Sequence, residues 1–340
     1  MNLIVLEEPD KKWDEFVSLH SQLIFHTSLW WKVLKQGYGG ETKYLVAEDG
    51  GEWLSALPGM MVGNRLFRVF YSLIPYGGFI GEPKHIPEFL NLLIDWAKKE
   101  KIQRIQIVDL AIKKKEDLPD FNCVESYRHV LELKDKSPDQ IWKNYHDGLK
   151  RNIKTAMKSD LSFEKIKSRE EVDQFYRLYL DSMRRNHALA KYPLKLFQKI
   201  YDLLVPEFSD ILFVKYHNQP IAGIVLIYSK DIAHYFHGGS DSNFLHLRPN
   251  DLLFHRAIPM AQERGKAYFD FLGSDKKFLS LIQFKDKWGA QKDELFNFHK
   301  DFGVIRPTLF KIALSLAQTS IGSAIHRRLK SLQKGTAHED

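Results

Sequence analysis

Residues 210–240, DILFVKYHNQPIAGIVLIYSKDIAHYFHGGS, contain three consecutive segments with the composition of β-strands. The first two, 210–218 and 220–229, are rich in β-branched and aromatic side chains and would be joined by a hairpin turn at Asn218–Gln219. The third segment, 232–240, follows directly after them. Three strands in immediate succession predict a β-sheet at the centre of this part of the chain.

Helical patterns surround these strands. Residues 169–186 and 193–204 precede them, and residues 248–265 follow, with Asn250 as the expected N-cap and Gly265 as the end. The remaining elements of this half are predicted on both sides: a helix at 137–159, strands at 161–168 and 267–274, a short helix at 279–290 and a final strand at 294–301.

The first part of the chain repeats this order. It predicts a strand, two helices, three strands, a helix and two further strands (2–7, 10–20, 27–40, 43–49, 52–62, 67–74, 86–101, 104–111 and 126–134). Asp109 ends one apolar strand as Asp270 ends the corresponding strand in the second half. We therefore expect two α/β domains, residues 1–136 and 137–306. Residues 307–340 predict a basic amphipathic helix that packs on the first domain or contacts anionic lipid headgroups.

Composition limits the class of protein. The 340 residues exceed the usual size of one hydrophobic core, and 44% hydrophobic with 27% charged residues is ordinary for a globular chain. The formal net charge of +7 favours anionic partners, although many globular proteins are mildly basic. The start, MNLIVLEEPDKKWDEF, does not resemble a signal peptide, and Cys123 is the single cysteine. We expect a cytoplasmic protein.

Several common motifs are missing from the sequence. There is no GxxxxGK[ST] loop, no GxGxxG after a strand and no GxSxG turn, which argues against nucleotide hydrolysis, dinucleotide binding and an esterase-type serine. His234 and His237 are three apart on an expected strand, so they should point to opposite faces and cannot share a metal ion. We assign no metal site.

Three segments of the second half belong together: LKRNIKTAMK (149–158), SDSNFLHLRPNDLLFHRAIPMAQERG (240–265) and FLGSDKKFLSLIQFKDKWGA (271–290). An apolar strand ending in Gly-Ser, a short loop and Phe-Lys-x-x-Trp-Gly resemble the FemAB/FemX family of peptidoglycan-bridge aminoacyltransferases and the related GNAT and BioF2-like acetyltransferase domains. The resemblance extends to FHTSLWWKVLK (25–35) and SLIPYGG (72–78) and so covers most of the chain. It implies two tandem GNAT-like domains with a mixed sheet.

The resemblance implies amide formation by an acyltransferase. An amine of a cell-wall precursor attacks an amino acid esterified to tRNA, and the family pattern places Lys285 and Phe284 at the oxyanion. Lys285 could instead be a solvated helix residue, and Phe284 could lie in the core with Trp288. Asp109 is a candidate for accepting the amine proton, or else a turn residue or helix cap.

The acceptor in this family is a muropeptide that carries a diphosphate. The matching positions for diphosphate contact are Lys35 and either Arg184 or Arg185, while Lys35 could equally lie on the wet face of its helix. Tyr235 could hydrogen-bond substrate or belong to the core. One basic helix face could contact tRNA phosphates or be merely solvated; it comprises Lys150, Arg151, Lys154 and Lys158.

The chain departs from the family pattern in two ways. It has no room for the coiled-coil arm of some members, and residues 240–251 lack the R/Q-x-x-G-x-G/A loop that binds the pyrophosphate of acetyl-CoA. We therefore expect no cofactor, with aminoacyl-tRNA as donor. The alternatives are an acyl-CoA-dependent N-acyltransferase acting on a polysaccharide or lipid-linked sugar, and a non-catalytic module that binds anionic glycans or nucleic acid. Peripheral contact with the inner membrane face is left open as a further interaction.

Overall fold

The computed structural model describes residues 1–64, 67–112 and 114–303. The first half contains β1 (Asn2–Leu6), α1 (Lys11–His20), η1 (Ile24–His26), α2 (Ser28–Gly37), β2 (Glu41–Asp49), β3 (Glu52–Asn64), β4 (Phe67–Ser72), β5 (Ile80–Gly81), η2 (Pro83–His85), α3 (Ile86–Lys99), β6 (Arg104–Asp109), η3 (Lys115–Asp117) and β7 (Asn122–Glu132). Asp10 and Thr27 cap the first two helices, since their side chains accept bonds from the N–H groups of Trp13 and Trp30.

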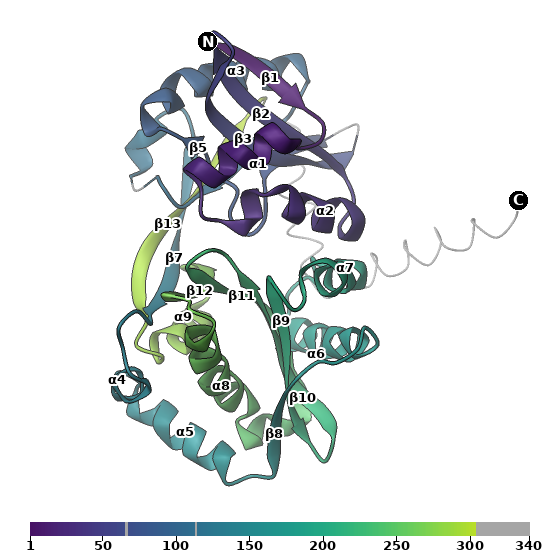
Figure 1. Cartoon of the computed structure of the whole chain (residues 1–340), viewed down its shortest axis with the longest axis vertical. Helices are drawn as coiled ribbons and strands as arrows, with labels where there is room; N and C mark the ends of the chain where they lie inside the picture. Colours follow the sequence, from purple (N-terminus) through teal and green to yellow (C-terminus); the bar gives the residue numbers. More distant parts are fainter. Residues whose placement is uncertain (65–66, 113, 304–340) are drawn as a thin grey trace, which may run out of the picture.

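The second half has the same order of elements after two short helices. It contains α4 (Pro138–Lys143), α5 (Asp147–Met157), β8 (Leu161–Lys165), α6 (Glu171–Arg185), α7 (Leu194–Leu204), β9 (Ser209–Tyr216), β10 (Gln219–Tyr228), β11 (Ile232–Ser240), η4 (Ser242–Leu247), α8 (Pro249–Glu263), β12 (Tyr268–Asp275), α9 (Leu279–Asp286) and β13 (Gln291–Asp301). Strand, two helices, three strands, helix and strand recur in both halves, so the predicted repeat and the α/β class are confirmed (Figure 1).

One sheet runs through both halves in the order β1-β2-β3-β4-β6-β13-β7-β12-β11-β10-β9-β8, and β5 pairs with β3. Two neighbouring pairs are parallel, β4 with β6 and β11 with β12. In the second pair, the hydrogen-bonded register ends at His234 opposite Asp270, although β11 continues to Ser240. The two strands therefore separate toward their carboxyl ends and leave an opening in the sheet.

The two halves exchange their last strands. β7, which ends the first half, pairs with β12, whereas β13, which ends the second half, pairs with β6 and crosses between the halves in Figure 1. Their side chains follow the pairing: Leu131 of β7 packs into the core of the second half, and Phe298 of β13 packs into the core of the first. Neither half completes its sheet or its core without a strand of the other.

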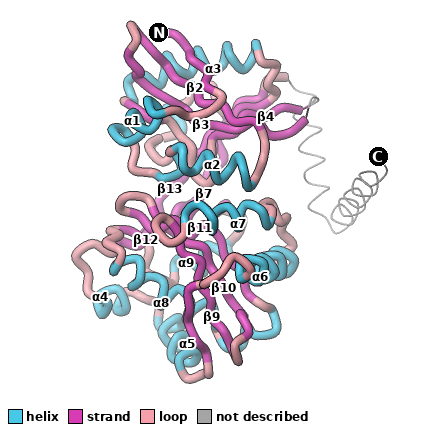
Figure 2. Tube along the Cα trace, turned by 45° about the vertical axis from the view of Figure 1, so that its right-hand side comes forward, coloured by secondary structure: helices cyan, strands magenta, loops and turns pink. Residues whose placement is uncertain are grey.

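Helices from both halves also pack together. α2 lies against α7, as the tube in Figure 2 shows, and their side chains share one core with the sheet. The contact is close at Gly37, because a Cβ there would lie 2.8 Å from the backbone of Leu196. On the other face of the second half, α5 and α8 cover β9 to β12 with a separate core.

Three local predictions were wrong. The expected helix 137–159 is broken at Asn144–His146, where the His146 N–H donates to the carbonyl of Lys287. The hairpin turn after β9 lies at His217–Asn218, both at positive φ, rather than one residue later. Asn250 does not cap α8; that helix begins at Pro249, and the Asn250 amide donates to Ser240.

The expected orientation of the two histidines of β11 was also wrong. A β-bulge at Phe236 adds a residue to β11, because Val225 pairs with His237 whereas Leu226 pairs with Tyr235. His234 therefore contacts the ring of Phe25, and His237 contacts the ring of Tyr179, both on the face that α2, α6 and α7 cover. The prediction assumed that successive side chains of β11 alternate between the two faces of the sheet, and the extra residue interrupts this alternation.

No helix within the described residues is long and apolar enough to cross a membrane. The predicted C-terminal helix at 307–340 lies outside the described residues. The domain boundaries at 136 and 306 stay predictions.

The strand exchange makes a prediction about stability. Phe298→Ala should lower the free energy of unfolding by about 3–5 kcal/mol, because it removes a fully buried ring from the core of the first half. Urea unfolding followed by circular dichroism and tryptophan fluorescence should show one transition that moves as a whole. Leu19→Ala, at a side chain that is 79% exposed, is the control. Two transitions of which only one moves would contradict the coupling of the halves.

Candidate active site

The opening between β11 and β12 is shaped by a bulge in β12. Asp270 pairs with Val130 of β7 and Gly273 pairs with Arg128, so Phe271 and Leu272 together oppose one residue. Leu272 has a φ of +61°, in the left-handed region that favours glycine. The bulge takes Phe271 and Leu272 out of the regular pairing of the sheet.

Lys285 of α9 reaches these two carbonyls. Its Nζ donates to the carbonyl of Leu272 at 2.9 Å and to that of Gly273 at 3.3 Å, and the residue is only 2% exposed. Burial lowers the pKa of the Lys285 amine to about 7, and nearby Asp270 opposes part of that shift. Lys285 is therefore not a solvated helix residue; it is a buried amine that titrates near neutral pH.

Asp270 is the centre of a buried polar network beside this amine. Its Oδ2 accepts bonds from Arg128 Nε at 3.1 Å, Arg128 Nη2 at 2.9 Å and His234 Nδ1 at 3.0 Å. Burial alone would raise the pKa of Asp270, but the guanidinium of Arg128 and the ring of His234 hold it well below its usual range. The carboxylate therefore stays ionised at neutral pH.

The network continues from His234 to the first half. His234 Nε2 lies 2.9 Å from Ser229 Oγ, and Ser229 Oγ accepts a bond from the N–H of Ile24. Ser229, His234 and Asp270 thus have the connectivity of a nucleophile, a base and an orienting acid. Ser229 is buried and already accepts the N–H of Ile24, so we interpret this chain of contacts as a link between the halves.

Phe284 and Tyr235 pack against α8. Both rings contact Phe254, at centroid distances of 5.3 Å for Phe284 and 4.7 Å for Tyr235. Trp288 packs in the same aromatic cluster and is fully buried. Both rings therefore belong to the aromatic core, which favours the core alternative for Phe284 and Tyr235.

Asp109 occupies in the first half the place that Asp270 occupies in the second. Its Oδ2 accepts from the Phe79 N–H at 2.7 Å, and its Oδ1 accepts from Ala111 at 2.6 Å and Ile112 at 3.2 Å. A carboxylate that accepts three backbone N–H groups holds a turn in place, and this favours the turn alternative over a role as proton acceptor.

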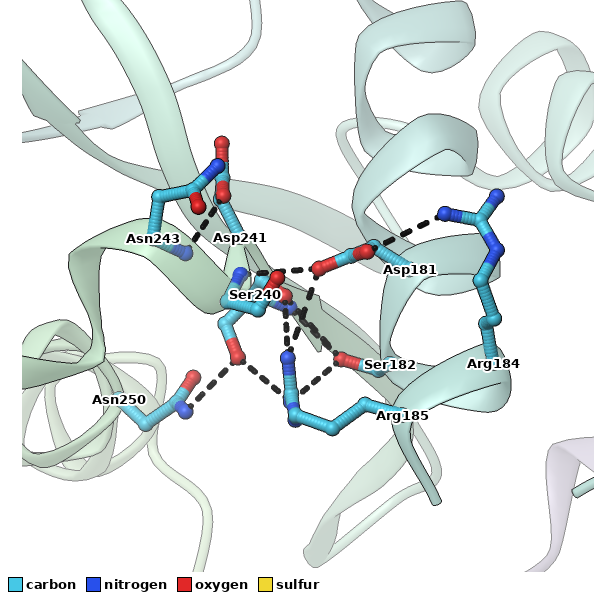
Figure 3. Close-up of polar contacts among 9 residues, drawn as sticks. Asp181, Ser182, Arg184, Arg185, Ser240, Asp241, Asn243 and Asn250 are labelled. Carbon is cyan, nitrogen blue, oxygen red and sulfur yellow. Dashed lines mark hydrogen bonds and ion pairs between the residues drawn. The ribbon is translucent and has the colours of Figure 1, made fainter. Parts of the chain in front are cut away.

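Figure 3 shows that Arg184 and Arg185 have different surroundings. The Arg185 guanidinium donates to the carbonyl and the hydroxyl of Ser240 and to the hydroxyl of Ser182, which fixes the end of β11 against α6. The Arg184 side chain is 79% exposed and lies 3.5 Å from one carboxylate oxygen of Asp181. Of the two, Arg184 is the one whose donors are open to a ligand.

In the loop between β11 and α8, two backbone N–H groups donate to carboxylates, one from α6 and one from the loop itself. Asp181 accepts from Ser242 N–H, and Asp241 accepts from Asn243 N–H, each at 2.9 Å (Figure 3). Arg248, in the left-handed conformation, then begins α8. Two backbone N–H groups of this loop, at the start of η4, are therefore already bonded to carboxylates and are not free for a pyrophosphate.

The other candidate positions lie apart from Lys285. Lys35 of α2 lies 3.6 Å from Glu8 and over the ring of Trp31. Along α5, Lys150 donates to the carbonyl of Lys143, whereas the remaining three basic residues (Arg151, Lys154 and Lys158) are exposed. Their contacts with diphosphate and tRNA stay predictions.

Two further features are outside this site. A cavity of about 460 Å³ lies at the opposite end of β12, lined by residues that include Lys134, Asp231 and Lys266. Within the described part of the chain, no three His, Cys, Asp or Glu side chains lie close enough together to hold a metal ion.

The region that contains this site is similar to a known protein family. Residues 143–285 match the family described as acetyltransferase (GNAT) domain, and this range contains β8 to β12 and reaches Lys285. Residues 143–285 form a GNAT acyltransferase domain. Curated protein sequences give no significant match. The predictions of an acyltransferase and of a GNAT fold are confirmed.

Solved structures match nearly the whole chain at low identity. FemX is 16% identical with a TM-score of 0.66, over 91% of this chain and 99% of FemX. A tandem GNAT protein from the clavulanic acid biosynthesis pathway is 8% identical with a TM-score of 0.61, over 89% and 99%. L-PGS from Bacillus licheniformis is 14% identical with a TM-score of 0.57, over 90% and 96%. The tandem arrangement of the two GNAT folds is thereby confirmed.

Sequence reasoning missed the partners of Asp270. The sequence places Asp270 at the end of an apolar strand. It gives no sign that Arg128 and His234, which lie within predicted strands, bind to it. Arg128 is 142 residues away in sequence and reaches Asp270 only because β7 is exchanged between the halves. No local pattern signals such a contact.

The two arginines of α6 give a direct test. Arg185→Ala should lower the free energy of unfolding by roughly 1.5–3 kcal/mol, because it removes charge-assisted hydrogen bonds to Ser240 and Ser182. Arg184→Ala should stay within about 0.5 kcal/mol of wild type, since its side chain is solvated. Denaturant unfolding of both variants measures the difference, and equal losses would contradict the assignment.

Proposed function

We propose that this acyltransferase moves an amino acid from aminoacyl-tRNA to an amine of a cell-wall precursor of the peptidoglycan type. The observation that supports this best is the buried Lys285 amine at the opening between β11 and β12. The Lys285 amine donates to two neutral carbonyls, so its protonated form keeps its charge available to an anion. FemX, an enzyme of the same fold, supports this reading.

The proposed step is an amide-forming displacement. The acceptor amine attacks the ester carbonyl of the aminoacyl-tRNA, and the protonated Lys285 stabilises the negative charge that develops on the carbonyl oxygen. The tetrahedral intermediate then breaks its bond to the ribose oxygen. The amine proton ends on that oxygen, giving an amide and tRNA with a free hydroxyl. No oxidant, metal ion or cofactor is needed for this balance.

The donor and acceptor assignments rest on different groups. Arg184, with open guanidinium donors, and Lys35 are the proposed diphosphate contacts, and the basic face of α5 is the proposed tRNA contact. Asp181 and Asp241 at the loop before α8 disfavour a coenzyme A pyrophosphate there. A cytoplasmic location, with contact to the inner membrane face, fits an acceptor made at that membrane.

A second candidate is an N-acyltransferase that uses acyl-CoA and acts on a polysaccharide or lipid-linked sugar. The family matched by residues 143–285 is described by acetyltransfer, and the clavulanic acid tandem GNAT protein has the same fold. These two matches are the observations that favour a coenzyme A donor. The loop carboxylates beside α8 count against it.

Lys285→Ala should reduce kcat by roughly 100- to 1,000-fold while the protein stays folded, because one oxyanion donor is removed. The assay is transfer of a labelled amino acid from charged tRNA to a UDP-linked muropeptide. Lys277→Ala, at an exposed lysine ahead of α9, is the matched control and should keep wild-type turnover. Wild-type turnover in Lys285→Ala would remove Lys285 from the mechanism.

Thermal unfolding with candidate ligands distinguishes the two donors. At about 100 times its dissociation constant, a ligand of the native state adds roughly 2.7 kcal/mol of stability. We expect the melting temperature to rise with a UDP-linked muropeptide and not with acetyl-CoA, because carboxylates occupy the loop donors. A rise with acetyl-CoA alone would replace the proposal with the second candidate. No rise with either would favour another acceptor or a binding module.

A further inference from the structure

Asp270 and Lys285 are connected through a single backbone residue. Asp270 Oδ1 accepts the N–H of Leu272 at 2.9 Å, and the carbonyl of that same Leu272 accepts a bond from Lys285 Nζ at 2.9 Å. Leu272 has a φ of +61°, a conformation that leucine adopts only when its surroundings hold it there. The side chain-to-backbone bond from two residues earlier supplies that support.

The supporting carboxylate is itself fixed. Its second oxygen accepts bonds from Arg128 on β7 and from His234 on β11, so three strands determine its orientation. Arg128 is mostly buried, and both Asp270 and His234 are fully buried. A rigid carboxylate of this kind holds the turn at Leu272 more firmly than a solvated one would.

Asp109 makes the same side chain-to-backbone bond in the first half, where its Oδ1 accepts the N–H of Ala111 two residues on, although Ala111 does not have a positive φ. The device at the end of this strand is therefore repeated in both halves. In the second half it additionally presents the Leu272 carbonyl to a buried amine. The first-half copy provides a matched comparison for the role of the second.

We propose that Asp270 is the positioning residue for Lys285: by holding Leu272 in its left-handed turn, it sets the carbonyls that fix the Lys285 amine. This inference rests on the proposed function, since it assigns Asp270 to the same site. Asp270 does not reach the reacting atoms in this scheme. It acts through the backbone, and its charge adds a smaller, direct effect on the amine.

The charged or titratable groups that interact with Lys285 are Asp270 on β12 and His129 on β7. Asp270 is in turn bonded to Arg128, and His129 to Asp286 of α9. Asp270→Asn removes one negative charge and weakens the turn, and both changes disfavour the ammonium form. The pKa of Lys285 should therefore fall below the wild-type value of about 7. It is measured by competitive acetylation with acetic anhydride across pH, followed by peptide mass spectrometry, which requires no substrate.

A glycine at position 272 should restore activity to the Asp270→Asn variant, which would not be expected if Asp270 only stabilised the fold. Asp270→Asn should lower kcat roughly 10- to 100-fold with little change in KM, as expected for a misplaced catalytic group. The double variant Asp270→Asn with Leu272→Gly should recover part of that loss, because glycine adopts positive φ without support from the carboxylate.

Two controls keep the test decisive. Asp109→Asn breaks the equivalent turn in the first half and should leave the Lys285 pKa unchanged. Where Asp270→Asn does not fold, Leu272→Val probes the same turn without touching the buried ion pair, and it should lower the Lys285 pKa because a β-branched residue disfavours positive φ.

An unchanged Lys285 pKa in folded Asp270→Asn or in Leu272→Val would overturn the proposal. So would a double variant no more active than Asp270→Asn. A lower Lys285 pKa in the variants, together with full turnover by Lys285→Ala, would support the positioning of the amine and reject the proposed function. The two failures are therefore distinguishable.

Discussion

The buried ion pair between Arg128 and Asp270 is the interaction on which the rest of the structure depends. Removing one partner of such a pair costs about 3–5 kcal/mol, because the other charge is then buried without compensation. Arg128 belongs to β7, so the pair holds the exchanged strand beside β12. From Asp270 the contacts extend to His234, Ser229 and the first half on one side, and to Leu272 and Lys285 on the other.

Most elements of the fold could be predicted from the sequence, because each has its own periodicity and its own end signals. The three strands between 210 and 240 lie where their composition placed them. What failed was set by contacts between distant segments. The β-bulge at Phe236 reversed the face of a histidine, and the contact of His146 with Lys287 broke an otherwise continuous helical pattern.

The site divides in the same way. Lys285 could be named from the Phe-Lys-x-x-Trp-Gly pattern, but its burial and its two carbonyl partners depend on the bulge in β12, which no local sequence signal reveals. The choice between Arg184 and Arg185 needed coordinates, since adjacent helix residues differ in direction and Ser240 selects one of them. Asp109 was a catalytic candidate because of its position at the end of a strand. In the structure its carboxylate accepts hydrogen bonds from backbone N–H groups instead.

The exchange of β7 and β13 also affects how the chain is made. During synthesis the first half leaves the ribosome with β6 at an open sheet edge, because β13, its partner, is encoded almost a whole half later. An unpaired edge strand is a template for association with other chains. The nascent protein must therefore protect that edge, by a temporary partner or by a chaperone, until residues 291–301 emerge and close the sheet.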